Sequence, residues 1–457
     1  MPVITDQFKK QVLDDLLTDF NTSSTVRYYA AIGRSEDWND SDIAAVPTND
    51  AKSVRQMRNS LQSIKLISDV SYVIPRRIWV ANLIYSAFDD NDVGFPANPF
   101  YIINSNNEVY ICLEQGKKLD ATSQLSTVQP SGNTTGTPFR TSDGYSWKFL
   151  YSIGALKADK FLSSAYMPVK FLASTDSNSP AEDLQQKIVQ DAAIKGQIVG
   201  YQITNGGAGY TSVPSVSIIG NGTNAIAYAT LAGGKIGSIK VKADSAGNSS
   251  TSYYGKDYQY ANVTITGGGG DSCTARAIIG HSGGIGSNPV LDLKSAALMF
   301  NTKPIGIEAG DFITGSEIFR QVALLRNPYV DSAAGTKLTS TTALALPKLV
   351  LSTSVFVKAT VQKSQITGVT TGAVAIIDDT NDSDTIWYHQ NETTGFIPFG
   401  ASEEIQVVGN TGISGTITSK VAGEFNSHTG DLLYIDNRSS VTRSTDQTED
   451  LKIVITI

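Results

Sequence analysis

Three histidines are the side chains of this sequence best suited to acid–base chemistry. They are His281, His389 and His428, and each lies in a different segment of the chain. A Ser-His-Asp triad has no fixed order along a sequence, so spacing alone does not exclude one. For His428, which precedes Thr429-Gly430 at the start of a strand-like segment, a role in a turn is the simpler interpretation.

Glycine-rich loops suggest a second chemistry, the binding of nucleotide phosphates. Gly220-Asn221-Gly222-Thr223-Asn224-Ala225 fits the dinucleotide pattern Gly-x-Gly-x-x-Gly/Ala. That pattern binds pyrophosphate only where a helix follows, because the amino terminus of the helix holds the phosphate. A strand-like segment, residues 226–230, follows here. Gly234-Lys235 is followed by Ile236 rather than by the Ser or Thr of a P-loop, so neither loop predicts a nucleotide site.

Two acidic clusters contain the oxygen ligands that calcium prefers. Residues 89–92 lack the late glutamate of an EF-hand loop. Residues 378–384 are richer in acids, and either a bound cation or a solvated hairpin tip explains them. Zinc is not supported, because no cluster of cysteines and histidines is present. We therefore predict that the protein is not an enzyme and needs no cofactor, and we leave a cation at 378–384 open.

Two segments combine arginine with tryptophan, residue types that often carry the binding energy of protein interfaces. Arg76 and Arg77 stand beside Trp79, and they are either surface arginines that pair with nearby acids or an interface anchor. Arg34 and Trp38 form the second pair, in which the tryptophan either lies buried beneath a loop or contacts a partner. We predict these five residues as partner contacts.

Length and composition predict several domains rich in β-structure. The chain has 457 residues, more than one compact core holds, with 40 glycines and only 17% charged residues. Its net charge of −7 argues against non-specific binding of nucleic acid. Cys112 and Cys273 do not make a disulfide framework, so we expect a reducing compartment. The first 20 residues do not resemble a signal peptide, and no apolar run reaches the ~18 residues of a membrane span.

Hydrophobic periodicity predicts both helices and strands in the first part of the chain, residues 1–194. Apolar residues at helical spacing predict helices over 8–20 and 54–64, and a short helix is expected over 180–193. Residues 123–141, rich in Ser, Thr, Gly and Pro, are expected to form a loop. Strands are predicted at 28–32, 78–85, 100–103, 109–113 and 145–153.

Residues 195–290 contain an internal duplication of short strands and glycine turns. The matched segments are 196–203 with 234–241, 209–218 with 257–265, and 225–231 with 274–279. The duplication predicts an inserted Gly-rich β-repeat domain.

A second insertion is predicted at 355–422, where short strands have the spacing of a small barrel or sandwich. Its predicted strands are 355–361, 373–377, 385–389, 405–408 and 415–419. The rest of the chain would form one core in three pieces, with 1–194 as its first part, 291–354 as its middle part and 423–457 as its closing strands.

The last seven residues have the alternating pattern of a strand with one buried face. Leu451, Ile453, Ile455 and Ile457 alternate with Lys452, Val454 and Thr456. We predict that they pair with a strand from far upstream that belongs to neither insertion.

Five short segments carry a resemblance to a known family. In chain order they are Gly33-Arg34-Ser35-Glu36-Asp37-Trp38; Val73-Ile74-Pro75-Arg76-Arg77 with Trp79; Asp143-Gly144-Tyr145 with Trp147; Phe319-Arg320-Gln321 before Asn327-Pro328; and Asn437-Arg438 before Asp446-Gln447-Thr448-Glu449-Asp450 and the final strand. Together they resemble the baseplate wedge protein of T4-like contractile-tailed phages, the product of gene eight. The resemblance covers a little over half of the chain and does not extend to residues 195–290.

The resemblance implies a mainly β, multidomain, sandwich- or barrel-like wedge protein with a few peripheral helices and two inserted β modules. It implies a homodimer in the tail baseplate of a virion, assembled in the host cytoplasm, that brackets neighbouring wedge proteins and proteins at the level of the short tail fibres. Such a subunit takes part in the rearrangement before sheath contraction. The alternative is a carbohydrate- or receptor-binding tail adhesin, since Gly/Tyr/Thr repeats can expose aromatic rings that stack on sugars.

Overall fold

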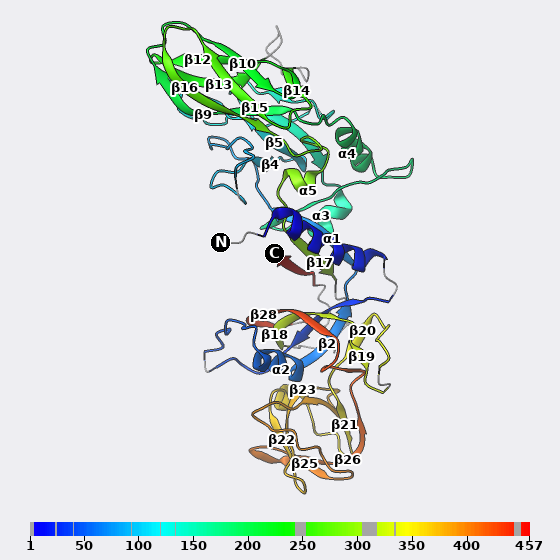
Figure 1. Ribbon diagram of the computed structural model, residues 1–457. Helices are drawn as coiled ribbons and strands as arrows, with labels where there is room; N and C mark the ends of the chain where they lie inside the picture. The colour runs from blue at the N-terminus through cyan, green and yellow to red at the C-terminus, as the bar shows by residue number, and fades with distance from the viewer. Residues whose placement is uncertain are drawn as a thin grey trace. The chain divides into compact units, whose positions relative to one another are not determined.

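The computed structural model describes residues 4–22, 25–39, 41–92, 94–118, 120–132, 134–242, 253–303, 318–332, 335–442 and 449–457. The chain forms two compact units (Figure 1). The first unit comprises Met1–Gln11, Ser71–Leu298 and Thr456–Ile457, and the second comprises Val12–Val70 and Met299–Ile455.

The protein is mainly β, as composition predicted. Strands hold 42% of the residues and helices 13%, and the strands form several antiparallel sheets. The helices predicted over 8–20 and 180–193 are present as α1 and α4. The helices of the described residues are α1 (Asp6–Thr22), α2 (Ala51–Asn59), α3 (Ala155–Phe161), α4 (Ala181–Asp191), α5 (Pro289–Asp292) and α6 (Lys358–Val361).

An aromatic core supports the first sheet of the first unit. The sheet has the strand order β4 (Tyr101–Ile103), β5 (Glu108–Glu114), β7 (Ser146–Ser152) and β6 (Phe139–Arg140). Tyr85, Tyr145 and Trp147 are fully buried beneath it, and Val189 of α4 packs in the same cluster. Beside this sheet, β8 (Tyr166–Val169) pairs with the second half of β3 (Asp69–Pro75).

The internal duplication appears in the strand pairing of the first unit. The first copy supplies β9 (Ile198–Ala208), β10 (Ser215–Gly220) and β12 (Ala227–Ala232), and the second supplies β13 (Lys235–Val241), β15 (Ala261–Thr266) and β16 (Asp271–Ile279). Two short strands, β11 (Thr223–Ala225) and β14 (Tyr254–Lys256), pair with each other.

The two copies exchange strands symmetrically. The first strand of each copy pairs with the last strand of the other, so that Tyr201 lies opposite Ala277 and Ile239 lies opposite Ala229. The middle strands, β10 and β15, pair with each other. Exchanging the two copies leaves this register unchanged, because Val216 lies opposite Ile265 and Ile218 lies opposite Val263. The module therefore has an internal two-fold pseudosymmetry.

Close packing against two tyrosines accounts for the glycine loops of the module. Tyr210 and Tyr258 occupy matching positions in the two copies and are 6% and 5% exposed. A Cβ on Gly268 would lie 3.0 Å from the Tyr210 ring, and a Cβ on Gly222 would collide with the Tyr258 ring. The segment that fits the dinucleotide pattern thus serves to cover a buried tyrosine, and no helix follows it.

The second unit contains a five-stranded sheet. Its order is β20 (Thr342–Leu344), β2 (Leu61–Leu66), β1 (Tyr28–Gly33), β18 (Ile318–Arg326) and β28 (Asp431–Thr442). Two short strands, β19 (Tyr329–Val330) and β27 (Phe425–Asn426), form a separate pair. Tyr29, Ile64 and Leu325 are buried in its core together with Met57 of α2. Asp50 caps α2, because its carboxylate accepts the backbone N–H groups of Lys52 and Ser53.

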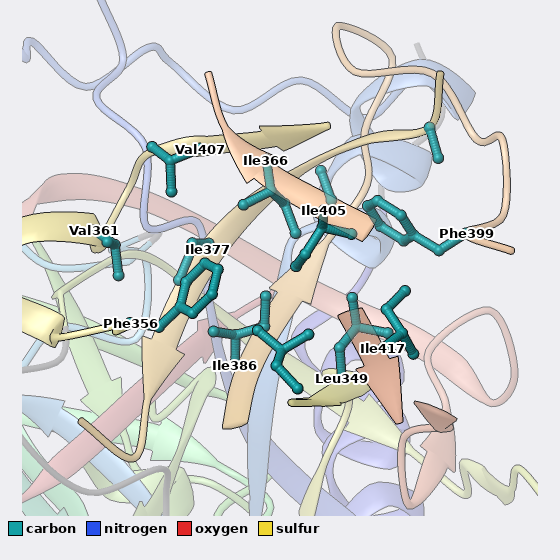
Figure 2. Close-up of a cluster of buried hydrophobic side chains, with 13 residues drawn as sticks. Leu349, Phe356, Val361, Ile366, Ile377, Ile386, Phe399, Ile405, Val407 and Ile417 are labelled. Atoms are coloured by element: carbon teal, nitrogen blue, oxygen red, sulfur yellow. The ribbon is translucent and has the colours of Figure 1, made fainter. Parts of the chain in front are cut away.

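A closed six-stranded barrel completes the second unit. Its strand order is β21 (Lys348–Leu351), β24 (Thr385–His389), β23 (Val374–Thr380), β22 (Gln365–Gly368), β25 (Glu404–Val407) and β26 (Asn410–Val421), and β26 pairs back onto β21. Figure 2 shows Ile366, Ile377, Ile405 and Ile417 in the filled interior. So small a barrel leaves room for side chains alone. The predicted boundaries of the insertions themselves stay predictions.

The final strand, β29 (Leu451–Thr456), lies next to β17 (Ala297–Thr302). This neighbour lies outside the residue ranges of both predicted insertions, as expected. It comes from the predicted middle part of the core, whereas a strand from one of the flanking parts was expected. Leu451 and Ile453 are buried at 8% and 4% exposure, whereas Ile457 is 41% exposed. The predicted buried face therefore covers only the first part of the strand.

Three local predictions are wrong. Residues 61–64 belong to strand β2 rather than to a helix, because pairing with β1 overrides the helical spacing of Leu61 and Ile64. Residues 78–85 form only isolated bridges, since Asn82 has a positive φ of 65° that interrupts a strand. Residues 358–361 form the short helix α6 and not a strand.

Replacing Gly222 by alanine should destabilise the duplicated module. The new Cβ would lie 2.5 Å from the Lys256 carbonyl oxygen and closer still to the Tyr258 ring. Overpacking of this kind costs about 1–3 kcal/mol, which we expect as a lower urea midpoint. Gly412→Ala is the control, because the nearest atom to its Cβ is 3.4 Å away. Equal urea midpoints for the two variants would show that packing against Tyr258 does not restrict position 222 to glycine.

Truncating side chains along β29 should have a graded effect. Ile453→Ala removes a buried side chain and should cost about 2–5 kcal/mol. Ile457→Ala alters a side chain that is 41% exposed and should cost much less. Thermal unfolding of both variants tests the assignment, and a larger loss for Ile457→Ala would contradict it.

Candidate interface site

Three of the resembling segments meet on the five-stranded sheet of the second unit. Gly33 of β1 lies opposite Gln321 of β18, which lies opposite Asn437 of β28. The Gln321 side-chain amide donates to Asn437 Oδ1 at 2.8 Å. Trp38 Nε1 donates to the Arg438 carbonyl oxygen at 2.9 Å. Segments up to 400 residues apart therefore form one contiguous site.

Arg34 and Trp38, two of the predicted partner contacts, pack on each other within this site. The Arg34 guanidinium lies 4.3 Å from the centre of the Trp38 ring and donates to the Asp37 carbonyl oxygen at 3.0 Å. Arg34 has a positive φ of 62°, an unusual backbone conformation that such contacts must hold in place. Both side chains are half-buried. Arg34 and Trp38 therefore hold the loop after β1 in place. Their contact with a partner protein remains a prediction.

Arg320, from the second of these segments in chain order, is a buried cation beneath the loop. Its side chain is 2% exposed and forms ion pairs with Asp37 and Asp42, the second at 2.7 Å. It also donates to the Ser35 carbonyl oxygen at 2.5 Å. The hydrogen bond from Arg320 lowers the pKa of the Asp42 carboxyl to about 2. Arg320 was not among the predicted site residues, although a charge within the apolar strand β18 was a usable signal.

His389 connects the same loop to the barrel. Its Nδ1 lies 2.6 Å from Asp378 Oδ2, and its Nε2 lies 3.1 Å from Glu36 Oε1. Burial alone would lower the pKa of this imidazole, but the two carboxylates outweigh it and raise the pKa to about 10. Burial would raise the pKa of Glu36, but His389 lowers it to about 2. Gln62 of β2 also donates to Asp378, at 3.3 Å, so the sheet, the loop and the barrel share one ionic network.

The acidic segment 378–384 divides between this network and a turn. Asp378 and Asp379 are buried in β23, where Asp379 pairs with Lys358 at 2.5 Å. Only the residues that follow form the hairpin tip, in which Asn381 Oδ1 accepts the Ser383 and Thr385 N–H groups. Within the described ranges, no group of three or more Asp, Glu, His or Cys side chains is placed to hold a metal ion.

The other acidic segment and the other histidines also have protein partners. Asp89 and Asp90 form ion pairs with Arg276 of β16. His281 Nε2 lies 2.9 Å from Asp292 Oδ1, and its Nδ1 accepts the Gly283 N–H. His428 lies exposed in a turn, as predicted, with its backbone N–H bound to Asn426.

Sequence reasoning overlooked one nucleophile pattern. Gly280-His281-Ser282-Gly283-Gly284 fits Gly-x-Ser-x-Gly, which in a nucleophile elbow joins a strand to a helix. Here β16 ends at Ile279, and the four-residue helix α5 begins only at Pro289. Because both ring nitrogens of His281 are engaged, this histidine has none left to activate Ser282.

The remaining predicted contacts, Arg76, Arg77 and Trp79, lie in the first unit. Trp79 Nε1 donates to Ser126 Oγ at 3.2 Å, and Ser126 Oγ donates to Asp143 Oδ2 at 3.1 Å. Trp79 also packs against the aromatic core that contains Trp147, so the two other resembling segments meet here. Arg76 donates to the Ser163 carbonyl oxygen at 3.0 Å, whereas Arg77 is exposed.

Comparison with known proteins adds no assignment: neither a protein-family model nor a curated protein matches this sequence. In the part of the chain that the structure describes, no helix is both long and apolar enough to cross a membrane.

Replacing His389 should change how stability depends on pH. The folded pKa of His389, about 10, exceeds its unfolded value of 6.5. Its contribution is therefore complete below about pH 6.5 and is lost as the pH rises towards 10. His389→Gln removes the cation between the buried Asp378 and the partly buried Glu36, and it should cost about 3–5 kcal/mol near pH 6.

The measurement is the melting temperature of both proteins between pH 6 and pH 10. We expect their difference to shrink as the pH rises. His428→Gln is the control, since His428 lies in an exposed turn, and it should behave as the wild type above pH 7. A difference that does not change with pH would contradict the ionic role of His389.

Proposed function

We propose that this protein is a structural subunit of a phage tail baseplate wedge. It would bracket neighbouring wedge proteins as a homodimer in the virion and take part in baseplate assembly and in the rearrangement before sheath contraction. The proposal requires neither catalysis nor a cofactor.

The observation that supports this proposal most strongly is the convergence of the five resembling segments. Three of them meet around Arg320 and Trp38 in the second unit. The other two meet around Trp79 and Asp143 in the first unit. Chance matches scattered along a sequence have no reason to become neighbours in the fold, so the convergence favours a shared structural origin.

An exposed apolar strip in the first unit supports a role in binding protein partners. Ile78 and Val80 are 54% and 49% exposed on either side of Trp79, and Leu83 is 47% exposed. Arg77 lies at the same strip and is also exposed. An apolar centre with an arginine beside it is typical of protein interfaces.

The alternative, a tail adhesin, depended on exposed aromatic side chains in the duplicated module. The matched tyrosines Tyr210 and Tyr258 are buried instead. Among the described residues of the module, Tyr260 is a strongly exposed aromatic side chain, at 64%. The structure therefore offers little support for rows of stacking platforms.

Arg77→Glu tests the bracket directly. We expect the purified wild type to be a dimer by light scattering at micromolar concentration, and to be present in tails isolated from infected cells. Reversing the charge at the apolar strip should reduce incorporation into tails at least about tenfold, because an unmatched charge at an interface costs several kcal/mol. The melting temperature should stay within a few degrees of the wild type.

Arg55→Glu is the matched control, an exposed arginine on α2 that is not part of the strip. It should enter tails normally. A strictly monomeric wild type that is absent from tails would refute the wedge proposal. A monomer that binds bacterial cells by itself would favour the adhesin.

A further inference from the structure

A cleft of about 440 Å³ lies within the first unit, between the duplicated module and the first sheet. Its walls come from the loop after Tyr85, from the end of β5, and from β9 and β13. Small-molecule sites have volumes of roughly 300–1,000 Å³. No residue of the ionic network or of the apolar strip lines this cleft.

On the side of β13 that faces away from β12, no strand pairs with the backbone N–H groups of Val241 and Ile239 among the described residues. Lys242 N donates to Ile226 O at 2.9 Å, so in this antiparallel pair the N–H groups of Val241 and Ile239 point away from β12. The Val241 N–H is bound by Glu114 Oε1 at 2.7 Å rather than by a strand. The N–H of Ile239, which lines the cleft, points to the same side and can donate to a ligand.

Two lysines and three carboxylates line the cleft, and two of the carboxylates already have arginine partners. Lys240 is half-buried in the wall and donates to the Gly144 carbonyl oxygen, and Lys117 lies exposed at the mouth. The Glu114 carboxylate is bound to Arg140 at 2.5 Å and to the Val241 N–H, and the Asp89 carboxylate is paired with Arg276. The two lysines therefore face Asp92 as the remaining acid of the lining, and this balance favours an anion.

The neutral part of the lining suits a sugar ring. Phe88 and Tyr201 contribute aromatic carbon, and Gln115 and Gln202 contribute amides. The Gln202 amide oxygen accepts from Arg276 Nε at 2.7 Å, which leaves its NH₂ group as a donor. Aromatic carbon binds the apolar faces of sugars, and amides and backbone N–H groups bind their hydroxyls.

We propose that this cleft binds a carboxylated monosaccharide unit, a hexuronic acid, with its carboxylate directed to Lys117 and Lys240. A concave site of this size suits a single sugar better than a protein surface, which needs an interface of roughly 1,000 Å² or more. The site is independent of the wedge role, since none of its residues lies in the five resembling segments.

The test compares glucuronate with glucose, which differ in charge at one carbon. We expect saturation-transfer NMR on the full chain to detect glucuronate and not glucose, with binding that weakens as salt is added. Lys117→Gln should weaken glucuronate binding about tenfold or more, because a hydrogen bond to a charged group is lost. Lys118→Gln, the exposed neighbour that does not line the cleft, should bind as the wild type does. Lys240→Gln provides a second variant.

Three outcomes would overturn the proposal. The first is no binding of glucuronate at millimolar concentration. The second is equal binding of glucose, or binding that neither lysine variant weakens. The third is equally strong binding of N-acetylglutamic acid α-amide, which would identify the cleft as a receptor for a protein carboxylate instead of a sugar.

Discussion

The need to give buried charges hydrogen-bond or ionic partners is the constraint on which both units depend. An ionised side chain removed from water costs several kcal/mol unless a partner and hydrogen bonds compensate it. In the second unit, Arg320 finds its acids in a loop some 280 residues away, the Asp37 contact spanning 283 positions. In the first unit, the buried Lys148 donates to the carbonyl oxygen of Ile285, 137 positions away. Such contacts form only when distant segments of the chain have come together. They therefore stabilise the complete fold and leave partly folded states with uncompensated charges.

This arrangement gives the loop after β1 an unusual role. Glu36 reaches His389 of the barrel, Asp37 reaches Arg320 of the sheet, and Trp38 reaches the backbone of β28. Three consecutive residues thus contact three different elements. A loop tied in this way has little freedom of its own, and any displacement of the barrel relative to the sheet within this unit must break several charged contacts together. The loop is therefore suited to respond in an all-or-none manner rather than gradually.

Local sequence patterns predicted helices and strands better than they predicted which side chains contact each other. The α1 and α4 periodicity, the barrel strands β23 to β26 and the alternation of β29 were readable, because each is encoded within a few turns or residues. The segment around Leu61 misled, since its spacing fits a helix while its pairing with β1 makes it a strand. The ionic role of His389 could not be predicted, because nothing near it in sequence indicates Glu36. Arg34 and Trp38 were chosen as possible contacts for an external partner, and the structure shows what they contact within the chain.

The strand exchange in the duplicated module has a consequence for its origin. Because the first strand of each copy pairs with the last strand of the other, a single copy could not satisfy its own strand edges. An ancestral chain with one copy would have needed to associate with its twin, as a swapped homodimer. With both copies in one chain, this pairing is an intramolecular step with a high effective concentration. The two halves can also differ in sequence, and only the second carries the four-glycine turn at residues 267–270.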